Sequence, residues 1–294
     1  NPFEMVVDTT IAGVSGVGNF TLLLSSNSAY RYYIEWGDGI TSASTVSTNL
    51  THNYSSSGIY AVKIYGRFDS IRCGFSGEAN KITDVLSWGN IKWRNFLFGF
   101  WGAQNLTGMT TQPPILELMG GANDFYLIFG DCAFDVDLGS WDVSNVNDMR
   151  NMFTDNLNTT NFNNGGSPSI SGWTTSNVTN MSGMFDGTTN FNQPIGSWDV
   201  SNVTTMVDMF KEATNFNQDL SNWDMGNVTT MADMFNLATN FNQDLSSWNV
   251  SGVTNMHSMF QDADSFNQNI GSWDVSGVEG ISTSTSFTRM FSQN

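Results

Sequence analysis

The chain has 294 residues, and its 27 acidic residues against 10 Lys and Arg give a formal net charge of −17. We therefore expect neither a nucleic-acid partner nor binding to an anionic bilayer, because both need clustered basic residues. No segment approaches the ~20 apolar residues of a membrane-spanning helix, so no membrane insertion is expected. The hydrophobic content of 39%, with 22 Phe, 15 Met and 10 Trp, is enough for a large buried core.

Residues 1–70 contain short aromatic and β-branched runs separated by clusters of Gly, Ser and Asn, a pattern typical of strands in a β-sandwich. The expected strands are Phe20–Leu24, Tyr30–Trp36 and Ile59–Tyr65. Trp36-Gly37-Asp38-Gly39 indicates a turn, and a His52-x-Tyr54 pair precedes the last strand. Together these motifs resemble the PKD-like (polycystic kidney disease domain-like) sandwich. The resemblance implies a spacer or docking module of an extracellular or virion protein.

Two cysteines, Cys73 and Cys132, are the only ones in the chain. They could form one disulfide, but we expect two buried free thiols instead. The cysteine count therefore does not decide between reducing and oxidising compartments.

A repeat dominates residues 131–294 and consists of about six units. The units are marked by Trp141, Trp173, Trp198, Trp223, Trp248 and Trp273, of which the last four are 25 residues apart. The longer interval after Trp141 is expected to contain an extended loop between Asn156 and Ser169. The last unit is stretched between Val278 and Met290. Because one unit cannot bury its own Trp and Phe, the units are expected to stack into a solenoid with a continuous core.

Within a unit, two apolar patterns predict two elements. Met206, Met209, Phe210 and Ala213 follow the i, i+3, i+4, i+7 spacing of a short helix. Leu220, Trp223, Met225 and Val228 predict a strand and its exit. Asparagines at a fixed offset are interpreted as a structural ladder that bonds to the backbone of the neighbouring turn; they are Asn192, Asn217, Asn242 and Asn267.

The repeated sequence W-D-V-S-N-V-T-x-M-x-x-M-F-x-x-A-x-x-F-N-Q resembles that of the BspA-type leucine-rich-repeat surface proteins over residues 131–294. The segment Lys81–Thr107 looks like the divergent unit that often precedes such arrays, so we assign residues 71–130 to divergent capping repeats. The predicted fold is mainly β with short helices: an N-terminal β-sandwich, then an α/β leucine-rich-repeat solenoid with a parallel sheet. The resemblance implies an extracellular adhesion or recognition protein and carries no catalytic residues.

The candidate ligand-binding residues follow the repeat tryptophan. Asp142, Asp199, Asp224 and Asp274 come directly after it, and we assign Thr175 and Asn249 to the same row in the other two units, with Ser201 and Ser251 beside it. One interpretation is a stripe that binds cations or polyols, because stacked carboxylates repel each other. The alternative, which we favour, is that each carboxylate accepts from its own following turn.

Other chemistries lack the residues they require. His52 and His257, the only histidines, have no Cys or second His at ligand spacing, so no zinc or other metal is expected. No G-x-S-x-G sequence is present for a hydrolase nucleophile. We therefore expect a protein that is not an enzyme and that needs no cofactor.

The predicted function is non-catalytic adhesion, or recognition of a cell-surface glycan or protein receptor, through the exposed repeat face. The alternative is a virion structural protein, such as a capsid decoration, fibre or tail component docked through the N-terminal module. Its partners would be other virion or appendage proteins and further copies of the chain in a homo-oligomer. Both hypotheses imply an extracellular location, on a cell or on a virion surface. The negative charge is concentrated in the repeats. Residues 131–294 carry 18 acidic and 3 basic residues, whereas residues 1–130 carry 9 acidic and 7 basic residues.

Overall fold

The structure is a computed structural model that describes residues 1–24, 31–45, 49–68, 70–74, 77–94, 96–110, 112–116, 125–155, 162–278 and 290–291. The chain divides into two compact units, Asn1–Val136 and Asp137–Asn294. It is mainly β, with short helices and mixed sheets. Residues 156–161 of the expected loop and residues 279–289 of the stretched last unit lie outside the described residues. Within the described ranges, no helix is long and apolar enough to cross a membrane.

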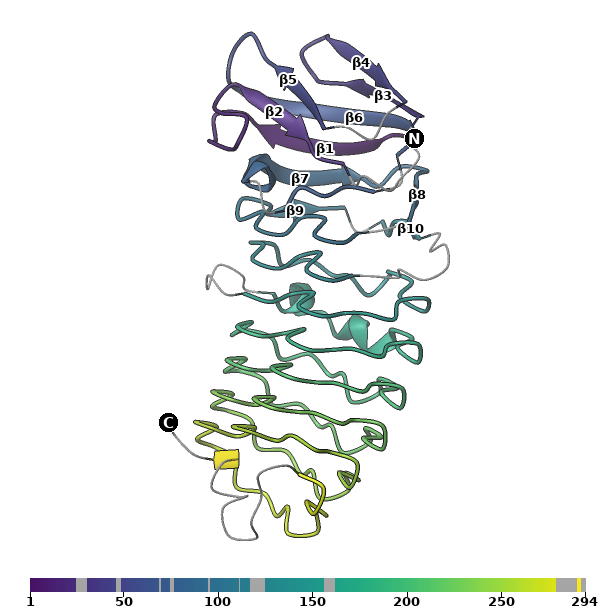
Figure 1. Ribbon diagram of the computed structural model, residues 1–294. Helices are drawn as coiled ribbons and strands as arrows, with labels where there is room; N and C mark the ends of the chain where they lie inside the picture. The colour runs from purple at the N-terminus through teal and green to yellow at the C-terminus, as the bar shows by residue number, and fades with distance from the viewer. Residues whose placement is uncertain are drawn as a thin grey trace. The chain divides into compact units, whose positions relative to one another are not determined.

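The first unit is built on a six-stranded sheet in the order β4-β3-β6-β1-β7-β9 (Figure 1). Its strands are β1 (Phe3–Asp8), β3 (Arg31–Glu35), β4 (Thr41–Ser44), β6 (Ile59–Arg67), β7 (Ile82–Ser87) and β9 (Gly108–Met109). Neighbours are antiparallel except β7 and β9, which are parallel. Two smaller sheets pair β2 (Asn19–Leu22) with β5 (Leu50–Asn53), and β8 (Lys92–Trp93) with β10 (Ile115–Leu116). The three expected strands are confirmed as β2, β3 and β6, and the main sheet continues beyond residue 70.

The turn motif and the histidine motif of the first unit meet in one aromatic cluster. His52 stacks on Trp36 with ring centroids 4.8 Å apart, and its edge contacts Tyr54 at 4.4 Å. Its Nε2 lies 2.8 Å from Asp38 Oδ2, while the Tyr54 hydroxyl donates to the Trp36 carbonyl at 3.0 Å. Burial raises the pKa of Asp38, but the hydrogen bonds from His52 and from the Ile40 N–H outweigh it and leave that pKa below its usual range. His52, in β5, therefore connects the smaller sheet of β2 and β5 to the turn that follows β3.

A buried ion pair of the first unit is hydrogen-bonded to the segment that leads into β2. Lys81 and Glu78 belong to η1 (Glu78–Lys81), a 3-10 helix, and both side chains are fully buried, with Nζ and Oε1 3.3 Å apart. Lys81 Nζ also donates to the carbonyls of Gly16 and Asn19, each at 2.7 Å. Glu78 accepts from the backbone N–H of Thr21 at 3.0 Å. Full pairing compensates for the loss of water around two charges.

The second unit consists of successive turns of chain, and each turn bonds to the next one. Isolated parallel bridges connect Asp148, Asn180, Thr205, Thr230 and Asn255 in that order. Beyond each bridge, every second backbone N–H group donates to a carbonyl of the next turn. Asp208 donates to the Ala232 carbonyl at 3.0 Å, and Phe210 donates to the Met234 carbonyl at 2.9 Å. Helical structure in the described part of this unit is limited to η2 (Asn164–Gly166), η3 (Pro168–Gly172) and a fragment at 290–291.

The helix predicted from Met206 to Ala213 is wrong. Asp208 and Glu212 have φ angles of 57° and 59°, so the backbone enters the left-handed region every fourth residue and a right-handed helix cannot propagate. The intervening N–H groups close short turns, such as Met209 to Met206 at 3.3 Å. Four-residue turns place apolar side chains inward at nearly helical spacing, which is why the sequence pattern resembled a helix.

The strand predicted from Leu220 to Val228 is also wrong, although its apolar side chains are buried as expected. Trp223 and Val228 donate backbone N–H groups to the residues three positions earlier, Leu220 and Met225, and so form turns. The buried tryptophans stack, with Trp248 and Trp273 centroids 6.1 Å apart. Their indole N–H groups donate to the preceding turn, as Trp248 does to the Leu220 carbonyl at 2.9 Å. Core packing and hydrogen bonding therefore both connect neighbouring repeat units within the second compact unit.

Two segments of the first unit share the backbone pattern of the second. Phe98 and Phe100 donate N–H groups to the carbonyls of Tyr126 and Ile128, at 3.1 and 2.9 Å. Phe98 and Gly102 have positive φ angles of 56° and 76°, again four residues apart. The ladder of hydrogen bonds is therefore present before the regular repeat begins.

The cysteines are both buried and free, which confirms the expectation of two thiols. Burial raises the pKa of the Cys73 thiol to about 12, and the nearby Glu78 charge acts in the same direction. Cys132 donates its thiol to the Phe100 carbonyl at 2.9 Å. Both are buried core residues, and for Cys73 the raised pKa disfavours the thiolate, which is the reactive form of cysteine.

Candidate functional site

The predicted row of polar side chains after each repeat tryptophan, which we call the Asx row, lies exposed on the second unit. Its members Asp142, Asp199, Asp224, Asn249 and Asp274 are all exposed. In each, Oδ1 accepts the backbone N–H two residues further on; the distances are 3.1, 3.0, 3.0, 3.3 and 3.0 Å in that order. These are the Asx-turns of the favoured alternative.

The serines beside this row reinforce the same turns. The hydroxyl of Ser201 donates to Asp199 Oδ1 at 2.6 Å, and that of Ser251 donates to Asn249 Oδ1 at 2.8 Å. The Ser201 hydroxyl, followed by its N–H, holds the pKa of Asp199 below the usual range. One carboxylate oxygen is thereby committed to the local turn, and the other remains as the group that a ligand could contact.

Thr175 does not belong to this row. It is the second residue after Trp173, it is only 1% exposed, and its hydroxyl donates to the Asp199 carbonyl at 2.9 Å. It occupies the inward position that Val200 takes in the next unit, and the exposed place directly after Trp173 belongs to Thr174. The alternation of exposed and buried side chains after the tryptophan therefore corrects the assignment.

The asparagine ladder is structural, as predicted. Asn217 Oδ1 accepts the Asn242 N–H at 2.9 Å and the Gln243 side-chain amide at 2.8 Å. Asn242 repeats the arrangement with Asn267, at 2.9 Å. Threonines form a second ladder, in which the Thr229 hydroxyl donates to the Thr204 carbonyl at 3.0 Å. Both rows bond unit to unit, so their polar atoms have structural partners.

A third surface, which sequence reasoning missed, differs from unit to unit. It consists of four positions between the buried Met and Phe residues, and we call it the variable face. From the unit of Trp173 to that of Trp248 its members are Ser182, Gly183, Asp186 and Gly187, then Val207, Asp208, Lys211 and Glu212, then Ala232, Asp233, Asn236 and Leu237, then His257, Ser258, Gln261 and Asp262. Aligning the units within this one chain would have revealed it, because most other positions keep one residue or a close substitute.

Hydrogen bonds align the variable face into columns. Gly187 donates its N–H to the Lys211 carbonyl at 2.8 Å, and Glu212 donates to Asn236 at 2.7 Å. Residues at equivalent positions in neighbouring units are therefore one ladder step apart. Leu237, at 37% exposed, and His257 are its most accessible side chains.

The centre of the variable face is acidic. Lys211 lies 3.8 Å from Asp208 and also interacts with Asp186, Glu212 and Asp233. Burial first, and the neighbouring carboxylates second, raise the pKa of Asp186 to about 7, although Lys211 opposes them. Burial likewise raises the pKa of Asp208. One cation thus stands among four carboxyl groups, so Lys211 balances only part of the acidic charge at the centre of the variable face.

No group of three or more His, Cys, Asp or Glu in the described ranges is arranged to hold a metal ion. His257 is exposed, with Nδ1 3.0 Å from the Ser258 hydroxyl, and it is the one histidine among the members of the variable face. His52 is engaged with Asp38 in the aromatic cluster of the first unit. The two histidines therefore lie in separate units and in different surroundings.

Comparison with known proteins gives one family. A model described as "Mycoplasma protein of unknown function, DUF285" matches residues 123–229 and 195–294. The two matches overlap and together span residues 123–294, which is more than half of the chain. No curated protein matches the chain, and no solved structure does.

Proposed function

Since the chain belongs to the DUF285 family, we propose that it is a non-enzymatic surface protein that recognises a cell-surface glycan or protein receptor through its repeats. The proposed location is extracellular. The proposed architecture is a leucine-rich-repeat solenoid of the BspA type preceded by a PKD-like sandwich. The 25-residue spacing of inter-unit hydrogen bonds supports the first part, and the cluster of Trp36, Asp38, His52 and Tyr54 supports the second.

The observation that carries the proposal is the contrast between constant and variable positions. Constant polar residues, such as Asn217 and Thr229, are occupied in bonding one unit to the next. The side chains of the variable face have no such uniform bonding role, and those that are exposed or half-buried, such as Leu237, His257 and Lys211, differ in charge and size. A repeat that varies at exposed positions over a fixed framework can be adapted to one partner without loss of the fold.

We place specificity on the variable face and a supporting contact on the Asx row. Residues such as Asp224 and Ser251 present small polar groups at most steps, which suits many weak hydrogen bonds to a polyol. Lys211 and Leu237 present a charge and an apolar contact that neighbouring units lack. The two surfaces make separate contributions that substitution can distinguish.

The test is binding of the full chain to a printed glycan array and to purified matrix glycoproteins. Lys211→Glu with Leu237→Asn changes the variable face, and the Asn suits the positive φ of 60° at that position. Asp224→Asn with Ser251→Ala changes the Asx row and leaves an acceptor for the Gly226 N–H. Asp219→Asn, on an exposed loop, is the matched control.

We expect the variable-face variant to lose about tenfold or more in affinity, the Asx-row variant about threefold, and the control nothing, since a hydrogen bond is worth about 0.5–1.5 kcal/mol and one to a charged group about 1.5–3 kcal/mol. Loss only in the Asx-row variant would contradict the placement of specificity. Binding unchanged in both variants would overturn recognition by the repeats. Turnover of the bound glycan by the full chain would overturn the non-enzymatic assignment, and antibody labelling confined to the cytoplasm would overturn the location.

A further inference from the structure

A small pocket lies at the hairpin that joins β3 to β4, at one edge of the six-stranded sheet (Figure 1). It has a volume of about 310 Å³, and we call it the hairpin pocket. The described residues that line it are Glu35, Gly37, Gly39, Ile40 and Thr41. Its walls differ in chemistry: Glu35 supplies a carboxylate, Thr41 a hydroxyl group, and Ile40, at 55% exposed, an apolar surface.

Hydrogen bonds fix the hairpin that forms this pocket. Trp36 donates its backbone N–H to the Ile40 carbonyl at 3.2 Å, and Asp38 accepts the Ile40 N–H at 3.0 Å. Gly37 has a φ of 90°, and an added Cβ would lie 2.7 Å from the Ala61 carbonyl oxygen, so the hairpin packs closely on β6. A preformed pocket needs little ordering when a ligand binds.

A pair of tyrosines continues the exposed face of the sheet beside the pocket. Tyr33 precedes Glu35 by two residues in β3, so both side chains point to the same face, about 7 Å apart along the strand. Tyr65 lies opposite Tyr33 in β6, with ring centroids 5.9 Å apart. On its other side, Tyr33 faces Ala43 of β4, which has only a methyl group with which to cover the ring. The Tyr33 ring is accordingly 40% exposed.

Glu35 retains acceptor sites that a ligand can use. An ionised carboxylate has about four lone-pair sites, and the Tyr65 hydroxyl donates to Oε2 at 3.2 Å. Lys63, opposite Glu35 in β6, forms its ion pair with Glu4 instead, at 3.6 Å. Tyr65 therefore orients the Glu35 carboxylate, and further acceptor sites remain for hydroxyl groups.

This combination of groups favours an uncharged sugar. Pockets of roughly 300–1,000 Å³ hold small molecules. Hydroxyl groups donate to a carboxylate in charge-assisted hydrogen bonds, which are stronger than neutral ones. An aromatic ring provides a large apolar surface against which the C–H groups of a sugar ring can pack. A pyranose has a hydroxyl-bearing edge and an apolar face, so Glu35 and Tyr33 can serve two parts of the same glycan.

We propose that the hairpin pocket binds one ring of a neutral pyranose glycan, with its hydroxyl groups bonded to Glu35 and Thr41, and that the next ring packs on Tyr33. The site belongs to the first unit and does not depend on recognition by the repeats. It is therefore expected whether the repeats recognise a glycan or a protein.

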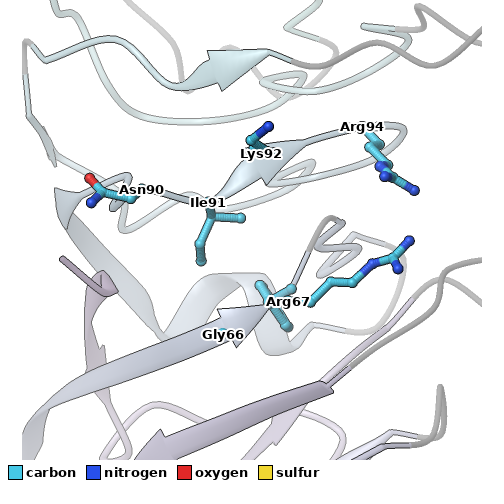
Figure 2. A pocket seen from close by; sticks show the side chains of 7 residues that line it. Gly66, Arg67, Asn90, Ile91, Lys92 and Arg94 are labelled. Carbon is cyan, nitrogen blue, oxygen red and sulfur yellow. The ribbon is translucent and has the colours of Figure 1, made fainter.

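Another pocket of the same unit supplies a comparison site. It has a volume of about 380 Å³ and lies between the end of β6 and the segment around β8 (Figure 2). Ile91 points between these two segments, and Arg67, Lys92 and Arg94 line the pocket. The three basic side chains have interaction partners of their own, so their charge does not select a ligand.

The experiment is a saturation-transfer NMR titration of the full chain with four neutral disaccharides: cellobiose, lactose, maltose and N,N′-diacetylchitobiose. Mannitol, an open-chain polyol, is the control ligand. We expect at least one disaccharide to bind with a dissociation constant of about 10 mM or tighter, unaffected by added salt because the ligand is uncharged, and mannitol to bind at least about tenfold more weakly. Binding of none of the four disaccharides, or equal binding of mannitol, would overturn the proposal.

Variants of the two contact residues separate their contributions. Tyr33→Thr removes the ring but keeps a strand-forming residue, and is expected to weaken the bound disaccharide about tenfold, whereas Tyr33→Phe keeps the ring and should stay within about twofold. Glu35→Gln leaves an acceptor for the Tyr65 hydroxyl and is expected to weaken binding about tenfold, because the hydrogen bonds to the ligand lose their charge assistance.

A third variant fills the pocket without removing a contact. An added Cβ at Gly39 meets nothing within 4 Å, and Asn tolerates the positive φ of 87° at this position. Gly39→Asn is therefore expected to fold normally and to weaken binding at least about tenfold, and it replaces the other variants if they unfold. Leu86→Thr, at an exposed position of β7, is the matched control and should change nothing.

Two further variants test other locations for the bound sugar. Lys92→Gln, in the comparison pocket, and Lys211→Glu with Leu237→Asn, on the variable face, should leave the affinity unchanged. Unchanged affinity in both Tyr33→Thr and Gly39→Asn would overturn the proposal. Loss of binding only in one of the two location variants would do the same, by placing the sugar in the comparison pocket or on the repeats.

Discussion

The buried ion pair of the first unit gives the sharpest prediction of stability, through the variant Lys81→Met. In the wild-type protein, Lys81 Nζ lies 3.3 Å from Glu78 and donates to the Ser15 hydroxyl at 2.8 Å and to the carbonyls of Gly16 and Asn19. Met has about the same length but no charge. The substitution therefore removes the interaction and retains most of the packing.

The expected cost is set by what Lys81 leaves behind. Glu78 stays fully buried without its cation, and it retains the N–H donors of Ser15 and Thr21, at 2.8 and 3.0 Å, together with the Ser15 hydroxyl. Breaking a buried pair from one side costs about 3–5 kcal/mol. Because Glu78 keeps three donors, we expect the middle of that range, about 4 kcal/mol in the free energy of unfolding.

The assay is urea unfolding followed by hydrogen exchange of peptides from the first unit, because tryptophans lie in both units. Lys63→Met is the matched control: its pair with Glu4, at 3.6 Å, is partly exposed and should cost less than about 1 kcal/mol. Lys81→Met with Glu78→Met removes both charges and should recover part of the loss. A cost below about 1 kcal/mol for Lys81→Met, or simple additivity in the double variant, would refute the reasoning.

Two further predictions concern the repeats. Because burial raises the folded-state pKa of Asp186 from 3.8 to about 7, the folded state binds more protons than the unfolded state in that range, and stability falls as pH rises through it, by at most about 4 kcal/mol. Asp186→Asn should abolish this fall in urea unfolding at a series of pH values; a slope equal to that of the wild type would contradict the assignment. Asn217→Ala removes the acceptor of the Asn242 N–H and of the Gln243 amide, and should cost about 1–2 kcal/mol by thermal unfolding. Asn222→Ala, an exposed asparagine of the same unit outside this ladder, is the control; an equal effect of both would refute a bonding role.

The sequence alone identified the features that depend on regular spacing along the chain. Tryptophans 25 residues apart identified the repeating unit, and the asparagine at a fixed offset was correctly interpreted as a ladder, since a periodic chain brings equivalent atoms together in every unit. The strands β2, β3 and β6 also followed from their aromatic and β-branched runs. Local hydrogen bonds were predictable for the same reason: the Asx-turn at Asp199 closes within three residues.

The conformation between Met206 and Ala213 could not be derived in this way. Its apolar spacing fits a helix and a series of four-residue turns almost equally well, because both place side chains inward after three or four residues. The positive φ angles of Asp208 and Glu212 are stabilised by hydrogen bonds to the next unit, so the choice depends on a partner 24 residues away.

The aromatic core of the first unit shows the same division between sequence and tertiary structure. Composition revealed a chain rich in Phe and Trp, and nothing in their spacing brings Phe68 to Trp93. Their rings pack edge to face with centroids 5.9 Å apart, which is a contact between segments that are distant in sequence. Periodic and local interactions are encoded by neighbours along the chain, whereas sites assembled from separate segments exist only once the core has brought those segments together.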